Sequence, residues 1–221
     1  MFEIIILFIN HIIYKMDIIA ITVCVDYEDI LKYMLKQNSK FFKIWYIVTS
    51  PDDKRTISYI EEAKIPNVQL LYFDHFFTNA RFNKGGAVKL AQEHIDKNHT
   101  DTNILILDAD IYLPDNFKEK LIDKLEDNTL YGVDKRFDYY SLYGFLNNEV
   151  SYQYDHCKNF VGFFQLYKQC ALKYENSENC GGCDNNFKDM FPNRIRLDIT
   201  VKHLGRDNIN WYGRNVTYEK Y

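Results

Sequence analysis

The sequence lacks any excess of positive charge. Its 27 Lys and Arg residues are outnumbered by 31 Asp and Glu residues, which gives a formal net charge of −4 at pH 7. Nucleic-acid-binding proteins gather Lys and Arg into a basic surface, so this composition argues against a nucleic-acid partner. An acidic chain that acts on an anionic substrate must concentrate positive charge locally or borrow it from a metal ion.

The sequence also lacks an apolar run long enough to span a membrane. Residues 1–15 come closest, but the stretch is short and has Asn10 and His11 in its middle, whereas a spanning helix needs about 20 residues. The basic start and small-residue cleavage site of a signal peptide are missing as well. We expect residues 1–15 to be an N-terminal extension or an extra strand, and residues 16–221 to be one domain of a soluble, cytoplasmic protein.

Cysteine is scarce, and its five residues are an odd number. This count fits a reducing compartment better than a disulfide framework. Cys180 and Cys183 have the CxxC spacing of a zinc knuckle. Cys157 and Cys170 lie upstream, too far apart in sequence for a second knuckle, so structural zinc is only an alternative.

Aromatic and apolar residues, by contrast, are plentiful. The 221 residues include 18 Tyr, 16 Phe and 2 Trp, and 47% of the chain is hydrophobic. A chain of this length and composition can bury a core and is expected to form one domain. The abundance of Ile, Asn, Lys, Tyr and Phe is typical of an AT-rich genome such as that of a large virus, which accounts for most of the aromatic content.

The first half of the chain alternates strand-like and helix-like segments. Residues 18–25 are a continuous apolar run rich in β-branched residues, as expected for a strand buried on both faces. The expected strands are residues 18–25, 43–49, 68–73 and 103–107, and the expected helices are residues 28–37, 83–96 and 114–125. This alternation predicts the α/β class, with a mostly parallel, Rossmann-like central sheet and helices on both faces.

Beyond Tyr131 the alternation stops. Residues 138–154 are aromatic and irregular, and residues 180–191 hold a short helix. Residues 161–167 and 196–201 are expected to be strands. Because no linker or repeat separates the halves, we interpret the second half as an irregular, substrate-binding part of the same domain.

The strongest local signal is a pair of carboxylates at the end of an expected strand. Asp108 and Asp110 follow the apolar residues 104–107. Ligands of parallel sheets bind beyond the carboxyl ends of the strands, and two close carboxylates resist burial unless a cation or shared proton compensates them. A hard divalent cation takes oxygen ligands and would bridge to a diphosphate. The alternative is a strand that ends in a solvated turn, where Asp is common.

The surroundings of this DxD motif resemble the GT-A glycosyltransferases over residues 16–214. The likeness rests on several pieces in a fixed order, each weak alone. They are residues 25–27 (VDY), 48–56 (VTSPDDKRT), 82–86 (FNKGG), 108–110 (DAD), 162–166 (GFFQL), 203–205 (HLG) and 210–214 (NWYGR). The resemblance implies a single GT-A domain with an irregular acceptor-side second half. It also implies a metal-dependent enzyme that moves a sugar from a nucleotide-sugar, most commonly a UDP-sugar, to a hydroxyl acceptor.

The resemblance further implies roles for individual residues. The metal ion, Mn²⁺ or Mg²⁺, would be held by Asp108, Asp110 and His203. The donor-binding residues implied are Tyr27, Asp53, Lys84, Asp108, Gly205 and Arg214. Lys84 opens an expected helix, whose positive N-terminus would add to its charge.

A lone histidine is usually a surface or core residue, but His203 has cations around it. Lys202, Arg206 and Arg214, if folded over the site, would neutralise the leaving diphosphate. The alternative is an ordinary basic C-terminal surface.

A general base for the acceptor hydroxyl is also implied. Family members place a carboxylate at the start of a helix after the Gly-containing strand, and Asp184 matches that position. The family's frequent second acidic residue is absent, because Asn185 follows. This departure leaves the base and the stereochemical outcome open, and Asp184 could instead cap the helix. Donor sugar specificity is expected from Phe164, Gln165 and Trp211.

Three other functions are compatible with parts of the sequence. A haloacid-dehalogenase-like phosphatase would use Asp108 as nucleophile, but its DxD motif normally closes the first strand rather than the fourth. A nucleotidyltransferase would need a Gly-rich basic loop where residues 25–29 are acidic. A non-catalytic carbohydrate-binding module is the third, although Asp108, Asp110 and His203 together favour an enzyme. The acceptor, whether glycan, protein or small molecule, is left open.

Overall fold

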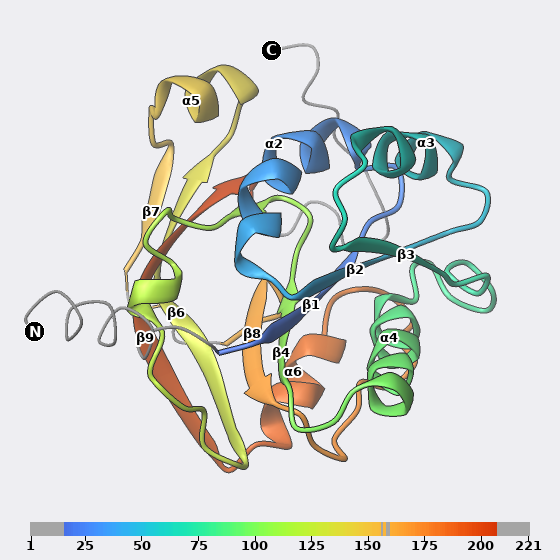
Figure 1. The fold of residues 1–221 in the computed structure, drawn as a ribbon. Helices are drawn as coiled ribbons and strands as arrows, with labels where there is room; N and C mark the ends of the chain where they lie inside the picture. Colours follow the sequence, from blue (N-terminus) through green and yellow to red (C-terminus); the bar gives the residue numbers. More distant parts are fainter. Residues whose placement is uncertain (1–15, 156, 158–159, 207–221) are drawn as a thin grey trace, which may run out of the picture.

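Four strands from the first half of the chain lie side by side and run in one direction (Figure 1). In the order of the sheet they are β3 (Val68–Tyr72), β2 (Ile44–Thr49), β1 (Ile18–Val23) and β4 (Asn103–Leu107). In the computed structural model, which describes residues 16–155, 157 and 160–206, they are the parallel half of a nine-stranded sheet. The four strands overlap the four expected from the apolar runs.

Helices cover both faces of this sheet, as predicted (Figure 1). The helices between the parallel strands are α2 (Glu28–Asn38), α3 (Lys54–Ala63) and α4 (Lys84–Asn98). Apolar side chains of α2, such as Leu31, pack with Trp45 and Ile47 on one face. The α4 residue Ala91 packs with Tyr46 on the other face, because neighbouring residues of a strand point to opposite sides.

The second half of the chain extends the sheet with mixed strand directions. Its strands are β5 (Ile111–Tyr112), β6 (Thr129–Tyr139), β7 (Tyr152–Tyr154), β8 (Phe164–Lys168) and β9 (Asn193–Leu204). β8 pairs antiparallel with β4 and β6, while β9 runs parallel to β6. Two short helices, α5 (Leu142–Asn147) and α6 (Cys183–Asp189), complete this half. The prediction of an irregular second half missed the long strand β6, whose residues pair with three neighbours.

The helix predicted at residues 114–125 is wrong. Only a single 3-10 turn, η2 (Lys118–Lys120), forms there. The helical spacing came from Phe117 and Leu125, which are indeed buried. They reach the core from an irregular segment, with the Phe117 ring against Phe41 and Phe164. The apolar residues of this segment are therefore explained by their packing in the core and not by a helix.

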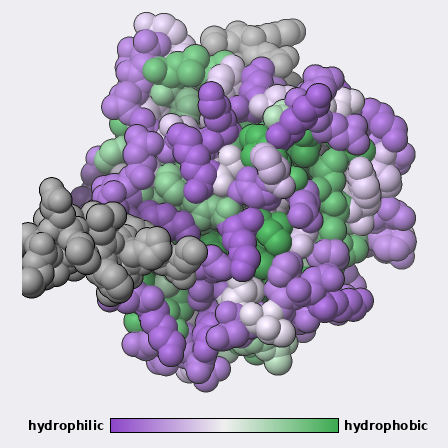
Figure 2. Space-filling model, viewed as in Figure 1, coloured by the Kyte–Doolittle hydropathy of each residue, from purple (hydrophilic) through white to green (hydrophobic). Residues whose placement is uncertain are grey.

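The surface of the molecule is mostly polar, with apolar patches between the charged side chains (Figure 2). One patch lies over α5, where Leu146 and Tyr143 are among the most exposed large hydrophobic residues described. None of the helices in the described part of the chain combines the length and apolarity that crossing a bilayer requires. The segment 1–15, Trp211 and Arg214 lie outside the described residues.

Candidate active site

The carboxyl ends of three parallel strands bring acidic residues to one edge of the sheet. Asp26 follows β1, Asp53 follows β2 and Asp108 follows β4. The Asp53 carboxylate is buried and accepts hydrogen bonds from the backbone N–H groups of Asp26 and Thr56 and from the Thr49 hydroxyl. Asp53 thus caps α3 and ties the end of β1 to the end of β2.

Tyr27, the other residue expected at a donor base or ribose, lies directly before α2. Its carbonyl accepts hydrogen bonds from the N–H groups of Ile30 and Leu31. The side chain is half-buried and packs against the core. Tyr27 and Asp53 therefore line the same edge as Asp108, each with a structural role at a helix start.

Lys84 joins Asp108 to Asp184. Its Nζ atom lies 2.8 Å from Asp108 Oδ1 and 3.5 Å from Asp184 Oδ1. The lysine side chain is 9% exposed, so the charge is held away from bulk water. Three elements meet here, because Lys84 opens α4, Asp108 follows β4 and Asp184 lies in the first turn of α6. The cluster carries two carboxylates against one ammonium group.

The backbone at the start of α4 is closed by protein groups. The Gly85 N–H donates to Ser177 Oγ, and the Gly86 N–H donates to the capping side chain of Asn83. A Cβ on Gly85 would lie 1.9 Å from the Glu175 carbonyl oxygen, so glycine is needed for this close approach. These two amide groups already have protein partners, so they would not bind a phosphate directly. The positive N-terminus of α4 can therefore act only by adding to the positive charge of Lys84.

A second cluster surrounds Asp110 and His203. The His203 Nε2 atom lies 3.5 Å from Asp110 Oδ2, and its Nδ1 atom lies 2.9 Å from Asp138 Oδ1. Arg136 donates to both oxygens of Asp138, at 2.8 and 3.1 Å. The Arg136 guanidinium also lies over the rings of Tyr154 and Phe163, 4.5 and 4.8 Å from their centroids. All of these groups except Asp110 come from β6, β7, β9 and the segment before β8.

Sequence reasoning missed Arg136 and Asp138. Both lie beyond Tyr131, where the alternation of strands and helices was expected to stop, and both are buried. The available signal was their period-two spacing, which places them on one face of a strand. In β6 this face turns toward His203, because Asp138 pairs with His203 in register.

The protonation states follow from burial and from these partners. Burial alone would lower the pKa of Lys84, but Asp108 and Asp184 outweigh it and hold that pKa well above its ordinary value. Burial, reinforced by Asp110 and Asp184, raises the pKa of Asp108 to about 6 although Lys84 opposes the rise.

In the second cluster burial would lower the pKa of His203, but Asp110 and Asp138 raise it to about 9. Burial would raise the pKa of Asp110, yet His203 outweighs it and holds that pKa below its ordinary value. At neutral pH the Asp110–His203 pair is therefore an ion pair in the absence of a metal.

The residues of this second cluster fit a metal ion in two respects. The Oδ1 atom of Asp110 is buried and has no hydrogen-bond partner among the described residues. His203 keeps Nε2 toward Asp110 while Nδ1 is held by a carboxylate, as is usual for metal-binding histidines. The three predicted ligands are not all together, because Asp108 pairs with Lys84. Over residues 16–155, 157 and 160–206, no group of three or more His, Cys, Asp or Glu side chains is placed to hold a metal.

The residues that follow β9 are arranged around His203. A Cβ on Gly205 would lie 2.7 Å from His203 Nε2, so the absence of a side chain keeps that nitrogen accessible. Lys202 points to the opposite face of β9, over the rings of Tyr112 and Tyr139. Arg206 lies over the ring of Tyr140. Lys202 therefore does not reach a leaving diphosphate beside His203.

Phe164 and Gln165 do not lie at a substrate surface. Phe164 is buried in the core against Phe117, and the Gln165 side chain is buried among protein groups. The expectation that these two residues contact the donor sugar is therefore not supported.

The cysteines of the zinc alternative are not brought together. Cys157 packs in the core on the α2 side of the sheet, whereas Cys170 and Cys183 pack on the α4 side. Burial raises the pKa of the Cys180 thiol to about 11 and that of the Cys183 thiol to about 12. These thiols are therefore protonated at neutral pH in the metal-free protein.

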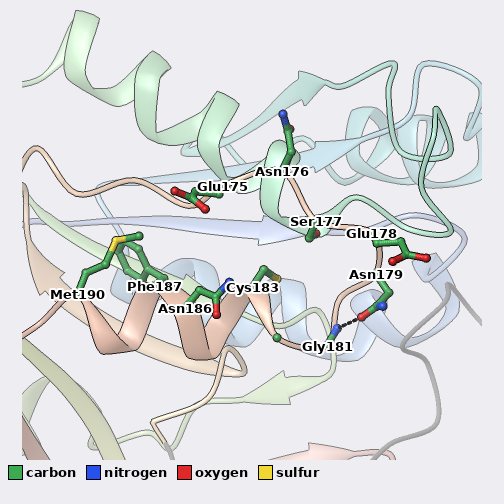
Figure 3. A pocket seen from close by; sticks show the side chains of 11 residues that line it. Glu175, Asn176, Ser177, Glu178, Asn179, Gly181, Cys183, Asn186, Phe187 and Met190 are labelled. Carbon is green, nitrogen blue, oxygen red and sulfur yellow. Dashed lines mark hydrogen bonds between the residues drawn. The ribbon is translucent and has the colours of Figure 1, made fainter.

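A polar pocket of about 300 Å³ lies between the segment 175–179 and α6 (Figure 3). Ser177, Asn179 and Asn186 contribute hydrogen-bonding groups, and Cys183 and Phe187 contribute apolar ones. Because Cys183 precedes Asp184 on α6, the pocket adjoins the first cluster. No sequence signal pointed to it.

The chain matches no protein-family model and no curated protein. Among solved structures it is similar to a 4-diphosphocytidyl-2C-methyl-D-erythritol synthase, with a TM-score of 0.48 and 14% identity over 94% of this chain and 95% of that chain. The synthase of the same description from Anaerococcus prevotii DSM 20548 gives a TM-score of 0.47 and 12% identity over 86% and 90% of the two chains. HddC from Yersinia pseudotuberculosis gives 0.36 and 12% over 68% and 76%. The α/β class with a Rossmann-like parallel half is confirmed by the strand order itself.

Proposed function

We propose that the protein is a metal-dependent glycosyltransferase that uses a nucleotide-sugar donor, with a UDP-sugar as the first candidate. The observation that carries the proposal is that the two carboxylates of the DxD motif have different partners. Asp108 engages a buried lysine, while Asp110 keeps an unpaired buried oxygen beside the Nε2 atom of His203. Both carboxylates lie at the carboxyl end of β4, where parallel sheets bind nucleotides.

Asp110 and His203 would hold the metal ion, Mn²⁺ or Mg²⁺, and Asp108 would join them when the donor draws Lys84 away. When bound, the ion would stabilise the negative charge that develops on the leaving diphosphate. Asp138 and Arg136 keep the imidazole of His203 oriented. Gly205 leaves room beside the imidazole.

The donor would lie across the ends of β1, β2 and β4. Its base and ribose would contact the edge lined by Tyr27 and Asp53, and its diphosphate would contact Lys84 and Arg214. Lys84 supports this placement because its ammonium group already bridges two carboxylates and can exchange one of them for a phosphate oxygen. A buried ammonium group interacts with phosphate more strongly than one in water.

Asp184 would act as the general base. The acceptor hydroxyl oxygen would bond to the anomeric carbon of the sugar while the bond from that carbon to the diphosphate oxygen breaks. The proton of the hydroxyl would pass to Asp184, and the nucleoside diphosphate would leave with the bonding electrons. The polar pocket beside α6 offers hydrogen-bonding groups for such an acceptor.

The first experiment is a calorimetric titration of UDP into the protein with Mn²⁺ and then with EDTA. We expect binding that requires Mn²⁺ and that weakens at least tenfold in Asp110→Asn, because a charged metal ligand is lost. The matched control is Asp198→Asn, which removes an exposed carboxylate of β9 that pairs with Lys120. UDP binding that is equally tight in EDTA would contradict a metal-dependent donor site.

Turnover is then measured as UDP release from UDP-glucose, UDP-galactose and UDP-N-acetylglucosamine. Release of inorganic phosphate from a generic phosphate ester, lost in Asp108→Asn, would instead favour the phosphatase reaction with Asp108 as nucleophile.

A further inference from the structure

A buried hydrogen-bond network ends on Asp184. The Tyr174 hydroxyl donates to Gln165 Oε1 and lies 3.2 Å from Asp184 Oδ1. The Gln165 amide nitrogen donates to the backbone carbonyl of Asp184 at 3.1 Å and to that of Phe160 at 2.7 Å. Gln165 and Tyr174 are 0% and 1% exposed, so neither uses water as a partner on its surface.

Burying polar groups destabilises a protein unless each group has a hydrogen-bond partner. Two apolar side chains in place of Tyr174 and Gln165 would avoid that cost. The presence of polar groups here therefore calls for an explanation, and the residue that they contact supplies it. They hold Asp184 at two points, its main-chain carbonyl and its carboxylate. The first turn of α6 is thereby tied to β8, and the carboxylate is aimed at Lys84.

Gly162 lies directly against this carboxylate. A Cβ on Gly162 would lie 2.1 Å from the Asp184 Cγ atom. The carboxylate therefore occupies space that any other residue at position 162 would fill. Tyr174, Lys84 and Gly162 together restrict the positions that the Asp184 carboxylate can take.

The Tyr174 hydroxyl suits a carboxylate that gains and loses a proton. It can donate its hydrogen to ionised Asp184, or rotate to donate to Gln165 and accept a hydrogen from protonated Asp184. A hydroxyl group with two acceptors serves both states without movement of heavy atoms. An amide nitrogen or an ammonium group, which only donates, could not do so.

We propose that Tyr174 and Gln165 are positioning residues that hold Asp184 in place as it accepts the proton of the acceptor hydroxyl. This inference rests on the proposed function, in which Asp184 is the base. Tyr174 acts through Asp184, so removal of its hydroxyl slows turnover only while the Asp184 carboxylate is present.

The test is a double-mutant cycle of Tyr174→Phe and Asp184→Asn, with Mn²⁺-dependent UDP release from a UDP-sugar as the readout. We expect Tyr174→Phe to lower kcat about tenfold, the effect of one lost buried hydrogen bond, with the KM for the donor unchanged. In the Asp184→Asn background the same change should have no further effect on kcat. Equal effects of Tyr174→Phe in both backgrounds would overturn the proposal.

The matched control is Tyr167→Phe. Tyr167 is equally buried and its hydroxyl accepts from Gln92 at 2.7 Å, without a contact to Asp184. This variant also loses one buried tyrosine hydroxyl, but one that does not contact Asp184, and it should keep the parent kcat. A tenfold loss in Tyr167→Phe as well would show a general effect of core hydroxyl groups and would refute the specific role of Tyr174.

Crystal structures of the Tyr174→Phe and Tyr167→Phe variants give a readout that does not depend on turnover. The proposal expects the Asp184 carboxylate to rotate away from Gly162 in Tyr174→Phe and to stay in place in Tyr167→Phe. An unmoved carboxylate in Tyr174→Phe overturns the positioning role even if no UDP-sugar is turned over. Absence of Mn²⁺-dependent UDP binding, by contrast, overturns the proposed function and leaves this structural comparison to decide the positioning role.

Discussion

The Nδ1 atom of His203 lies 2.9 Å from Oδ1 of Asp138, and this contact orients the Nε2 atom toward Asp110. The two residues face each other in the register of β6 and β9. Because the ring is buried and held at Nδ1, the imidazole has little freedom. A histidine held in this way can coordinate a metal ion through its second ring nitrogen.

The first prediction concerns Asp138. Asp138→Asn should weaken Mn²⁺-dependent UDP binding by about 10–100-fold, the usual effect of losing a carboxylate that orients a metal-binding histidine. Calorimetry in the presence of Mn²⁺ measures the change. The control is Asp134→Asn, four residues earlier in the same strand and half-buried. An unchanged affinity in Asp138→Asn would show that His203 does not depend on this contact.

The second prediction is a pH dependence of the metal-free protein. The pKa of His203 is raised to about 9 by Asp110 and Asp138 against the effect of burial, whereas that of an unfolded histidine is about 6.5. The resulting stabilisation is fully present below pH 6.5 and is lost as the pH rises to about 9. Urea unfolding in EDTA at pH 6.5, 7.5 and 9 should show a falling free energy of unfolding.

His203→Gln serves as the comparison for this series. The variant should lose most of the decline between pH 6.5 and 9, because the titrating group is gone. A decline of the same size in His203→Gln would assign the effect to other groups. Metal binding should show the opposite trend, tightening as the pH rises, because the ion displaces the proton from His203.

The third prediction concerns Lys84. Lys84→Met removes the only ammonium group described between Asp108 and Asp184 and leaves two carboxylates facing each other in a buried site. We expect a loss of about 3 kcal/mol in the free energy of unfolding and a loss of UDP binding.

The double variant Lys84→Met/Asp108→Asn separates these effects. It should recover much of the stability, because one uncompensated charge is removed, but it should not recover UDP binding. Chemical denaturation and calorimetry give the two readouts. If the double variant remained as unstable as Lys84→Met, the ion pair would not be the source of the loss.

The fourth prediction concerns Gly205. Gly205→Ala adds a methyl carbon that would lie 2.7 Å from His203 Nε2. This distance is too short for a contact, so the imidazole ring must turn. We expect Mn²⁺-dependent UDP binding to fall at least tenfold while the melting temperature changes little. Gly144→Ala in α5 is the control, because an added Cβ there would meet the Glu149 carbonyl oxygen at 3.1 Å and has no atom of His203 among its nearest neighbours. A Gly205→Ala variant that binds UDP normally would show that Nε2 does not need this space.

The parallel half of the fold and the residues at the ends of its strands could be predicted from the amino-acid pattern. Short apolar runs rich in β-branched residues are typical of central strands in a covered sheet, so β1, β2 and β4 and the position of Asp108 could be predicted from local pattern. The same reasoning failed at residues 114–125, where Phe117 enters the core without a helix. The spacing of apolar residues in a sequence indicates which side chains are buried, but it does not determine the backbone conformation from which they reach the core.

Which charged groups meet depends on contacts between segments that are distant in the sequence. Lys84, Asp108 and Asp184 are far apart in the chain, and so are Asp110, Asp138 and His203; only the strand order and the β6–β9 register bring each set together. Asp138 and Arg136 had no motif to mark them, because their role comes from the neighbour across the strand rather than from adjacent residues. The DxD motif could be found in the sequence, but the partner of each of its carboxylates depends on contacts between distant segments.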